Sequence, residues 1–101
     1  MDGAEQSTPP GYHGEKAALA ARMKRIEGQV RGIGRMIDDD TYCIDVLTQI
    51  AAVNAALHAV GVTLLDDHLS HCVVSAAQES DEAGRAKIAE ATAAVARLIK
   101  S

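Results

Sequence analysis

Three side chains in this sequence have the types and the spacing of metal ligands. Cys43 is followed 25 residues later by His68, and Cys72 comes four residues after that. If one helix carries all three, a rotation of 100° per residue places them within an arc of about 40°. His68 and Cys72 then lie one above the other on that face. Two thiols and an imidazole form a soft donor set, which favours Cu(I) or Zn(II).

The length of that helix decides how the three donors can meet. Twenty-five helical residues span roughly 38 Å, whereas bonds between a metal and its ligands are about 2 Å. Cys43 therefore cannot reach the other two donors of its own chain unless the helix breaks. An antiparallel partner helix that crosses near Ala56 would bring Cys43 of one chain beside His68 and Cys72 of the other. Two-fold symmetry then repeats the site. Three donors in an apolar seam suit trigonal Cu(I) better than structural zinc, which needs a fourth ligand.

The elements that must position these donors are predicted to be helices. Apolar residues recur at steps of four and three from Leu19 to Ile37, which is typical of a helix with a packing seam. Residues 38–41 break this helix and supply N-cap candidates for the next. A second helix is predicted from about Thr41 to about Gln78, with apolar residues all round it and Gly61 as its weak point. A polar turn at 79–82 precedes a third helix. The predicted fold class is all-α.

Composition suggests that the chain works as an oligomer. The 101 residues include no Trp or Phe, so the core must be built from small aliphatic side chains. Such a core buries little surface per subunit, and association with copies of the chain adds more. Residues 1–14 are polar and lack a period, so we expect a disordered N-terminal arm there and one helical domain at 15–101.

The sequence also suggests where the protein works. We expect no membrane span because no run of about 18 residues is apolar throughout. The N-terminus lacks the pattern of a signal peptide, which indicates a cytoplasmic protein with its two cysteines kept as thiols.

A second feature is a basic stretch on a chain whose net charge is −4. Residues 22–35 hold five cations and one acid, Glu27, which gives a local charge of +4. Three of the cations fall on the side of the helix opposite its apolar seam, where they suit phosphate groups. No helix-turn-helix pattern accompanies them, so DNA contact would require an oligomer that presents several such helices. The predicted DNA-binding residues are Arg22, Lys24, Arg25, Arg31 and Arg35.

Three longer stretches of the sequence resemble those of a known family, the copper-sensing repressors called CsoR. They are RMKRIEGQVRGIGRMI (22–37), TYCIDVLTQI (41–50) and HLSHC (68–72), and the resemblance covers roughly residues 15–99. Nickel- and cobalt-sensing relatives have a histidine where this chain has Cys72. Persulfide-sensing relatives lack the histidine found here as His68, and formaldehyde-sensing relatives lack the second cysteine.

The resemblance implies an all-helical dimer that pairs into a tetramer, binds a GC-rich operator when metal-free and releases it when Cu(I) binds. It implies Cys43, His68 and Cys72 as the ligands. It also implies that Tyr42 and Glu90 support the ligands from behind, with Glu90 accepting a hydrogen bond from the far nitrogen of His68. Some members carry an arginine in the middle of the second helix, where this chain has Ala59. DNA contact then falls to the first helix.

Two other functions remain open from the sequence. The same site would serve a cytosolic copper-buffering protein that has no DNA partner. A thiol redox or persulfide sensor would instead crosslink Cys43 and Cys72 of different chains, and His68 would be dispensable. An enzyme is not expected, because no Ser/His/Asp or paired-carboxylate arrangement is present and a three-coordinate ion in an apolar seam leaves little room for a substrate.

Overall fold

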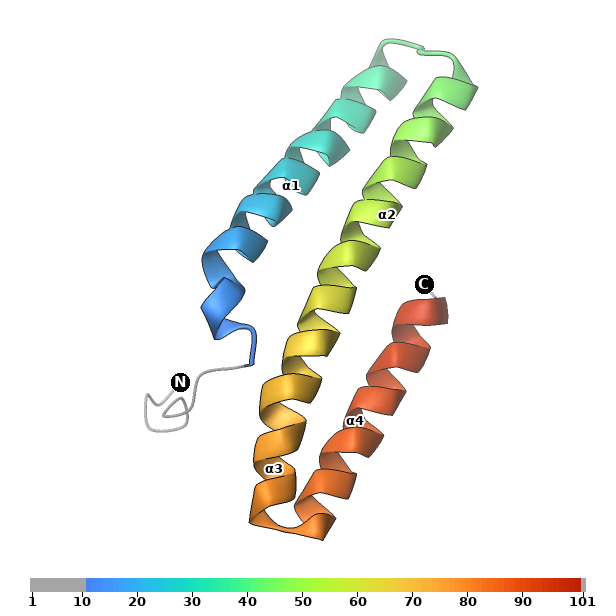
Figure 1. The fold of residues 1–101 in the computed structure, drawn as a ribbon. Coiled ribbons are helices and arrows are strands. Elements are labelled where there is room, and N and C mark those ends of the chain that lie inside the picture. The colour runs from blue at the N-terminus through green and yellow to red at the C-terminus, as the bar shows by residue number, and fades with distance from the viewer. Residues whose placement is uncertain (1–10, 101) are drawn as a thin grey trace, which may run out of the picture. The chain divides into compact units, whose positions relative to one another are not determined.

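The computed structural model describes residues 11–100, and these residues are almost entirely helical (Figure 1). A short 3-10 helix, His13–Glu15, leads into α1, Lys16–Asp38. Helix α2, Cys43–Asp67, continues through a π-helical turn, His68–Val73, into α3, Val74–Glu79, so that Cys43–Glu79 is one unbroken helix. Helix α4 spans Asp81–Lys100. The predicted all-α fold with three long helices is confirmed.

The expected N-terminal arm falls mostly outside the described residues. Its last four positions, 11–14, form a turn and most of the 3-10 helix. By its internal contacts the chain divides into two compact units. The first unit is Lys16–Gly61, and the second joins residues 11–15 to the described residues from Val62 onward.

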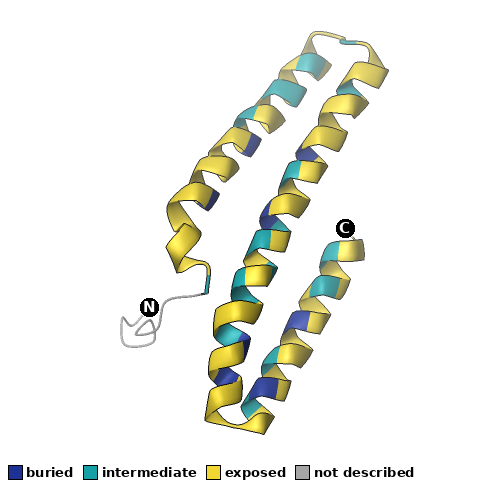
Figure 2. Cartoon of the chain, viewed as in Figure 1, coloured by how far each residue is buried: buried dark blue, intermediate teal, exposed yellow. Residues whose placement is uncertain are grey.

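In the first unit α1 and the first part of α2 form an antiparallel hairpin (Figures 1 and 2). Its core is a row of aliphatic side chains in which Leu19 and Ile26 from α1 pack with Val53 and Val60 from α2. Only alternate members of the predicted seam on α1 take part, because Met23, Val30 and Ile37 are between 43% and 61% exposed. In the part of α2 that belongs to this unit, the larger apolar side chains that stay exposed are Ile44, Leu47, Ile50 and Leu57.

The turn between α1 and α2 places Cys43 at the very start of its helix. Asp40 has a φ of 57°, and the amide of Thr41 donates to the carbonyl of Met36 at 2.9 Å. This is the left-handed helix ending in which the carbonyls of the last turn are satisfied by the following amides. We expected the N-cap of α2 among residues 38–41, and that was wrong. Tyr42 occupies this position, because its carbonyl accepts from the amides of Asp45 and Val46.

The second unit is packed through small residues. Val73, Ala76 and Ala91 are buried between the π-helical turn, α3 and α4. Gly84 allows the close approach, since a Cβ there would lie 3.0 Å from both the Cα and the Cβ of Ala77. Helix α4 begins at a polar turn, as predicted, where the hydroxyl of Ser80 accepts from the amide of Ala83 at 3.0 Å.

One helix has the length and hydropathy of a membrane span. Cys43–Glu79 contains an 18-residue window with a mean hydropathy of 1.5, of which 17% is buried within the chain. We expected no membrane span because no run of about 18 residues is apolar throughout. This helix passes only by its mean hydropathy, which tolerates polar side chains such as Asn54 and His58. The match is by length and composition only, and a helix that is covered by protein on all sides has the same composition.

Candidate metal centre

Two of the predicted ligands lie together on the π-helical turn. His68 is its first residue and Cys72 its fifth, so their side chains leave the helix about one turn apart. The His68 side chain is 30% exposed, and Cys72 is partly buried as a free thiol. A π-helical turn widens the helix locally because its backbone bonds run from residue i to i+5, and such turns are frequent at functional sites.

Helix α4 supplies a carboxylate to His68. The Nε2 of His68 lies 3.8 Å from the Oε1 of Glu90, and the same oxygen lies 3.6 Å from the Nζ of Lys87. The separation of Nε2 from Oε1 is longer than a hydrogen bond, so the predicted bond from Nε2 of His68 to Glu90 stays a prediction. If that bond formed, a proton on Nε2 would leave Nδ1 unprotonated, as a metal ligand must be.

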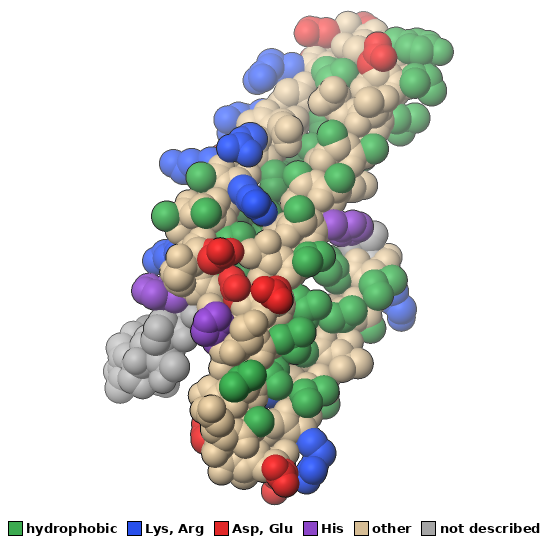
Figure 3. Space-filling view, in the orientation of Figure 1, with side chains coloured by type: hydrophobic (Ala, Val, Ile, Leu, Met, Phe, Trp, Pro, Cys, Tyr) green, Lys and Arg blue, Asp and Glu red, His purple; other side chains and the backbone are tan. Residues whose placement is uncertain are grey.

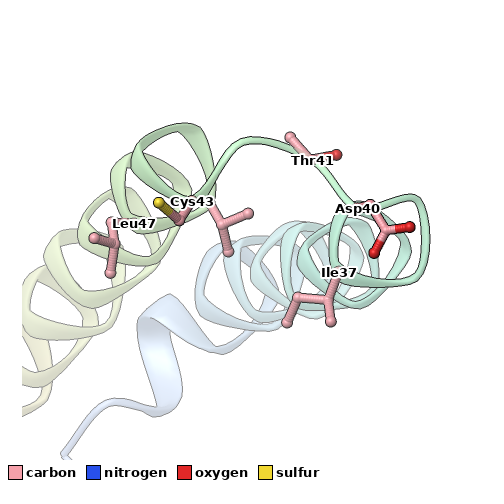
Figure 4. A pocket seen from close by; sticks show the side chains of 6 residues that line it. Ile37, Asp40, Thr41, Cys43 and Leu47 are labelled. Atoms are coloured by element: carbon pink, nitrogen blue, oxygen red, sulfur yellow. The ribbon is translucent and has the colours of Figure 1, made fainter.

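Cys43 stands apart from this pair, at the first residue of α2. Its side chain is exposed. It lines a shallow hollow of about 440 Å³ together with Ile37, Asp40 and Thr41 from the end of α1 and the turn, and Val46 and Leu47 from α2. Figure 4 shows Cys43 and Leu47 one turn apart on α2. The wall of the hollow is mostly apolar, so the sulfur meets few competing polar groups from its own unit.

A single chain does not bring the three donors together. Twenty-five residues of unbroken helix separate Cys43 from His68. Among residues 11–100, no group of three or more His, Cys, Asp or Glu side chains is placed to hold a metal ion. The donor types nevertheless fit Cu(I), since two thiols and an imidazole are the soft ligands that this ion prefers.

The remaining predicted residues have simpler surroundings. Tyr42, just before Cys43, is 67% exposed, and the whole length of α2 separates it from His68 along the chain. His71 also lies on the π-helical turn, and its Nδ1 donates to the carbonyl of Asp67 at 2.9 Å.

Three features were missed from the sequence. The sequence pattern predicts an ordinary α-helix where the π-helical turn lies, and it predicts a featureless arm at Gly11, whose position is close to the Cys72 sulfur. The third feature is Lys87, which shares the carboxylate of Glu90. Its spacing of three residues from Glu90 on one helix was the available signal.

The predicted DNA-binding residues all lie on α1 and are all exposed. Figure 3 shows Lys and Arg side chains gathered along this helix. Arg31 makes an ion pair of 3.5 Å with Glu27 one turn earlier. A Cβ on Gly28 would lie 3.8 Å from the Nη2 of Arg31, and one on Gly32 would lie 3.9 Å from that of Arg35, so these guanidinium groups lie beside glycine positions.

Comparison with known proteins decides the family. Residues 15–97 match the model of the metal-sensitive transcriptional repressors. The chain belongs to this family. It is therefore a transcriptional regulator and not an enzyme.

Members of the repressor family with close similarity are named for copper. The chain is 57% identical over 91 residues to the "Copper-sensing transcriptional repressor RicR" of Mycobacterium tuberculosis, covering 90% of this chain and 95% of the relative. It is 52% identical over 67 residues to the "Copper-sensing transcriptional repressor CsoR" of Bacillus subtilis, covering 66% of each. A crystal structure of the copper-sensing repressor CsoR with Cu(I), from Geobacillus thermodenitrificans, has a TM-score of 0.79 at 41% identity and covers 86% of this chain and 88% of that one.

Proposed function

We propose that this chain is a Cu(I)-responsive transcriptional repressor, which binds a GC-rich operator when metal-free and releases it when Cu(I) binds. Two relatives named as copper-sensing repressors, at 57% and 52% identity, support the choice of copper within the metal-sensitive family. The donor types support it independently, because thiolates and imidazole prefer a soft ion.

The proposed ligands are Cys43 of one chain with His68 and Cys72 of the partner subunit. The long helix carries exposed Ile44, Leu47 and Leu57, an apolar face that its own chain leaves uncovered. An antiparallel copy of the helix would cover this face and bring each Cys43 to a His68 and Cys72 pair. Pairing of two such dimers into a tetramer would cover further apolar residues. Burial by copies in place of lipid also accounts for the hydropathy of Cys43–Glu79 in a cytoplasmic protein.

The metal is proposed to act on DNA binding through His68 and Glu90. Nδ1 of His68 and the thiolate of Cys72 would hold Cu(I) together with the partner subunit's Cys43, and the bound ion would join the π-helical turn to that cysteine. His68 then presents a fixed Nε2–H toward Glu90, and Glu90 carries the change to α4. Tyr42, next to Cys43, is proposed to support the same site. Coupling is reciprocal, so operator DNA should weaken Cu(I) binding by the factor by which Cu(I) weakens DNA binding.

The cations of α1 are the proposed contacts to operator phosphates. Their exposure and their clustering on an otherwise acidic chain support this role. Because one helix offers few contacts, several copies of α1 in the oligomer would act together.

The observation that carries the proposal is the 3.8 Å approach of Oε1 of Glu90 to Nε2 of His68, because a carboxylate there would favour a proton on Nε2 and leave the other ring nitrogen for a metal. The test is an anaerobic Cu(I) titration of the full chain, followed by X-ray absorption and by gel-shift with GC-rich promoter DNA. We expect one Cu(I) per chain with two sulfur and one nitrogen ligands, and loss of the DNA complex at that ratio. Operator binding that persists with Cu(I) bound, or coordination by sulfur alone, would overturn the proposal.

A further inference from the structure

The turn at residues 11–15 lies against the π-helical turn that carries two of the proposed ligands. A Cβ built on Gly11 would stand 2.6 Å from the carbonyl oxygen of Asp67 and 3.2 Å from the Sγ of Cys72. Both neighbours belong to the same compact unit as Gly11. The main chain at Gly11 therefore passes directly over the sulfur of Cys72.

Glycine is required at this position for space and not for backbone conformation. Among the described residues no glycine has a positive φ, so other residues could adopt the backbone angles of Gly11. The closest neighbour of the added Cβ is a backbone oxygen, which cannot rotate away as a flexible side chain can. Any side chain at residue 11 must therefore push the turn away from the helix.

The turn itself is closed by local bonds. The amide of Glu15 donates to the carbonyl of Tyr12 at 2.8 Å, and His13–Glu15 form a 3-10 helix that leads into α1. The two cysteines differ accordingly. Cys43, at the start of α2, is exposed, whereas Cys72 under the turn is partly buried.

We propose that the turn at residues 11–15 is a cover over Cys72, which keeps bulky sulfur electrophiles such as low-molecular-weight disulfides away from this thiol. Cys72 is only partly buried, and a metal ion is much smaller than such a disulfide. The inference rests on the proposed function in one respect, since it treats Cys72 as a copper ligand that must stay unmodified.

The test uses the full chain with Cys43→Ser, which leaves Cys72 as its single thiol because the chain has two cysteines. In this background Gly11→Val, the milder Gly11→Ala, and Gly14→Val are compared. Gly14 is the matched control, since it lies in the same segment and a Cβ there meets nothing within 4 Å. Each protein is treated with oxidised glutathione or with the smaller iodoacetamide, and intact mass gives the rates. With oxidised glutathione the Cys72 thiolate attacks one sulfur, forms a mixed disulfide and releases reduced glutathione.

We expect Gly11→Val to raise the rate with oxidised glutathione by roughly threefold or more, because local opening controls access to a covered group. Gly11→Ala should also raise this rate. The rate with iodoacetamide should rise less than the rate with oxidised glutathione. Gly14→Val should react at the rate of the Cys43→Ser parent. Equal rates for the Gly11 and Gly14 variants would overturn the cover, as would an equal increase for both reagents.

A second measurement separates this inference from the proposed function. Gel-shift with GC-rich operator DNA and Cu(I) is repeated on the chain with both cysteines intact, with and without Gly11→Val. If Cu(I) releases the operator while the glutathione rates are equal, the cover is wrong and the repressor proposal stands. If Cu(I) does not release the operator from the unsubstituted chain, the repressor proposal fails whatever the rates are.

Discussion

The two compact units of the chain differ in both packing and chemistry. The unit Lys16–Gly61 joins its helices through larger aliphatic side chains such as Ile26 and Val53, and its surface carries the cations and the exposed Cys43. The unit that holds residues 11–15 and those from Val62 onward packs through alanine, valine and Gly84. It carries His68 and Cys72 on a π-helical turn.

This difference shows why neither unit is sufficient. The unit Lys16–Gly61 carries the cations proposed to bind DNA and one exposed thiol, Cys43. The other unit carries two of the proposed ligands, His68 and Cys72, on the π-helical turn. The proposed site, which needs all three donors, would join the second unit of one chain to the first unit of another. The proposed metal site and the DNA-binding surface are then linked because one helix, Cys43–Glu79, runs through both units.

The largest effect is expected from removing a donor in either unit. Cys43→Ala should weaken Cu(I) binding by at least about 100-fold, because even the loss of an outer partner of a ligand costs 10–100-fold. The metal-free protein should still bind the operator, and Cu(I) should no longer release it. In the other unit, His68→Ala removes a donor in the same way. Its matched control is His71→Ala, since both histidines lie on the π-helical turn. Normal release of DNA from His68→Ala by Cu(I) would contradict the proposed linkage.

The next largest effect concerns the contact from α4 to His68. Glu90→Gln removes the negative charge that favours a proton on Nε2, and we expect Cu(I) affinity to fall by roughly 10-fold or more. Lys87→Met is the companion variant. It frees the shared oxygen of Glu90 for His68, so affinity should rise slightly. Competition with a Cu(I) chelator measures both. An unchanged affinity in Glu90→Gln would mean that the contact has no role in the site.

A smaller effect is expected on the basic surface of the first unit. Arg35→Ala should weaken operator binding by roughly tenfold, and the slope of log affinity against log salt should fall by about one for each phosphate that is no longer neutralised. Cu(I) affinity should not change. Glu27→Gln should strengthen DNA binding slightly because it releases Arg31 from its ion pair. Arg97→Ala on α4 serves as the control of equal charge, and an equal loss of affinity there would show that the surface of α1 is not special.

The smallest expected effects compare the packing of the two units. Gly84→Ala places a Cβ 3.0 Å from Ala77, and overpacking of about 1–3 kcal/mol should outweigh a helix-propensity gain of about 1 kcal/mol. Gly34→Ala in α1 meets nothing within 4 Å and should be stabilising by up to about 1 kcal/mol. Thermal unfolding at one fixed protein concentration measures both. A loss of stability of the same size in both variants would contradict the difference in packing.

Much of the fold could be predicted because apolar periodicity is a local signal. The break after Asp38 and the polar turn before Asp81 follow from residue types that interrupt a helical pattern. The N-cap of α2 was placed too early, because Asp40 adopts the left-handed conformation that glycine usually takes at a helix end.

The candidate site was predictable in its residues but not in its surroundings. The spacing of Cys43, His68 and Cys72 is visible in the sequence, whereas the π-helical turn and the approach of Gly11 to Cys72 depend on packing between distant segments. The approach of Glu90 to His68 depends on how α4 packs: Gly84 and Ala91 are its buried residues, whereas Ile88 is 52% exposed.

Sharing of each metal site between two chains is tested most directly with mixed dimers. Chains with Cys43→Ala and chains with both His68→Ala and Cys72→Ala are given different affinity tags, co-expressed and purified through both tags. Neither variant alone retains a complete donor set. If the site is shared, the mixed dimer regains one complete site, and we predict one tightly bound Cu(I) for every two chains. A mixed dimer that binds no Cu(I) tightly would contradict a shared site.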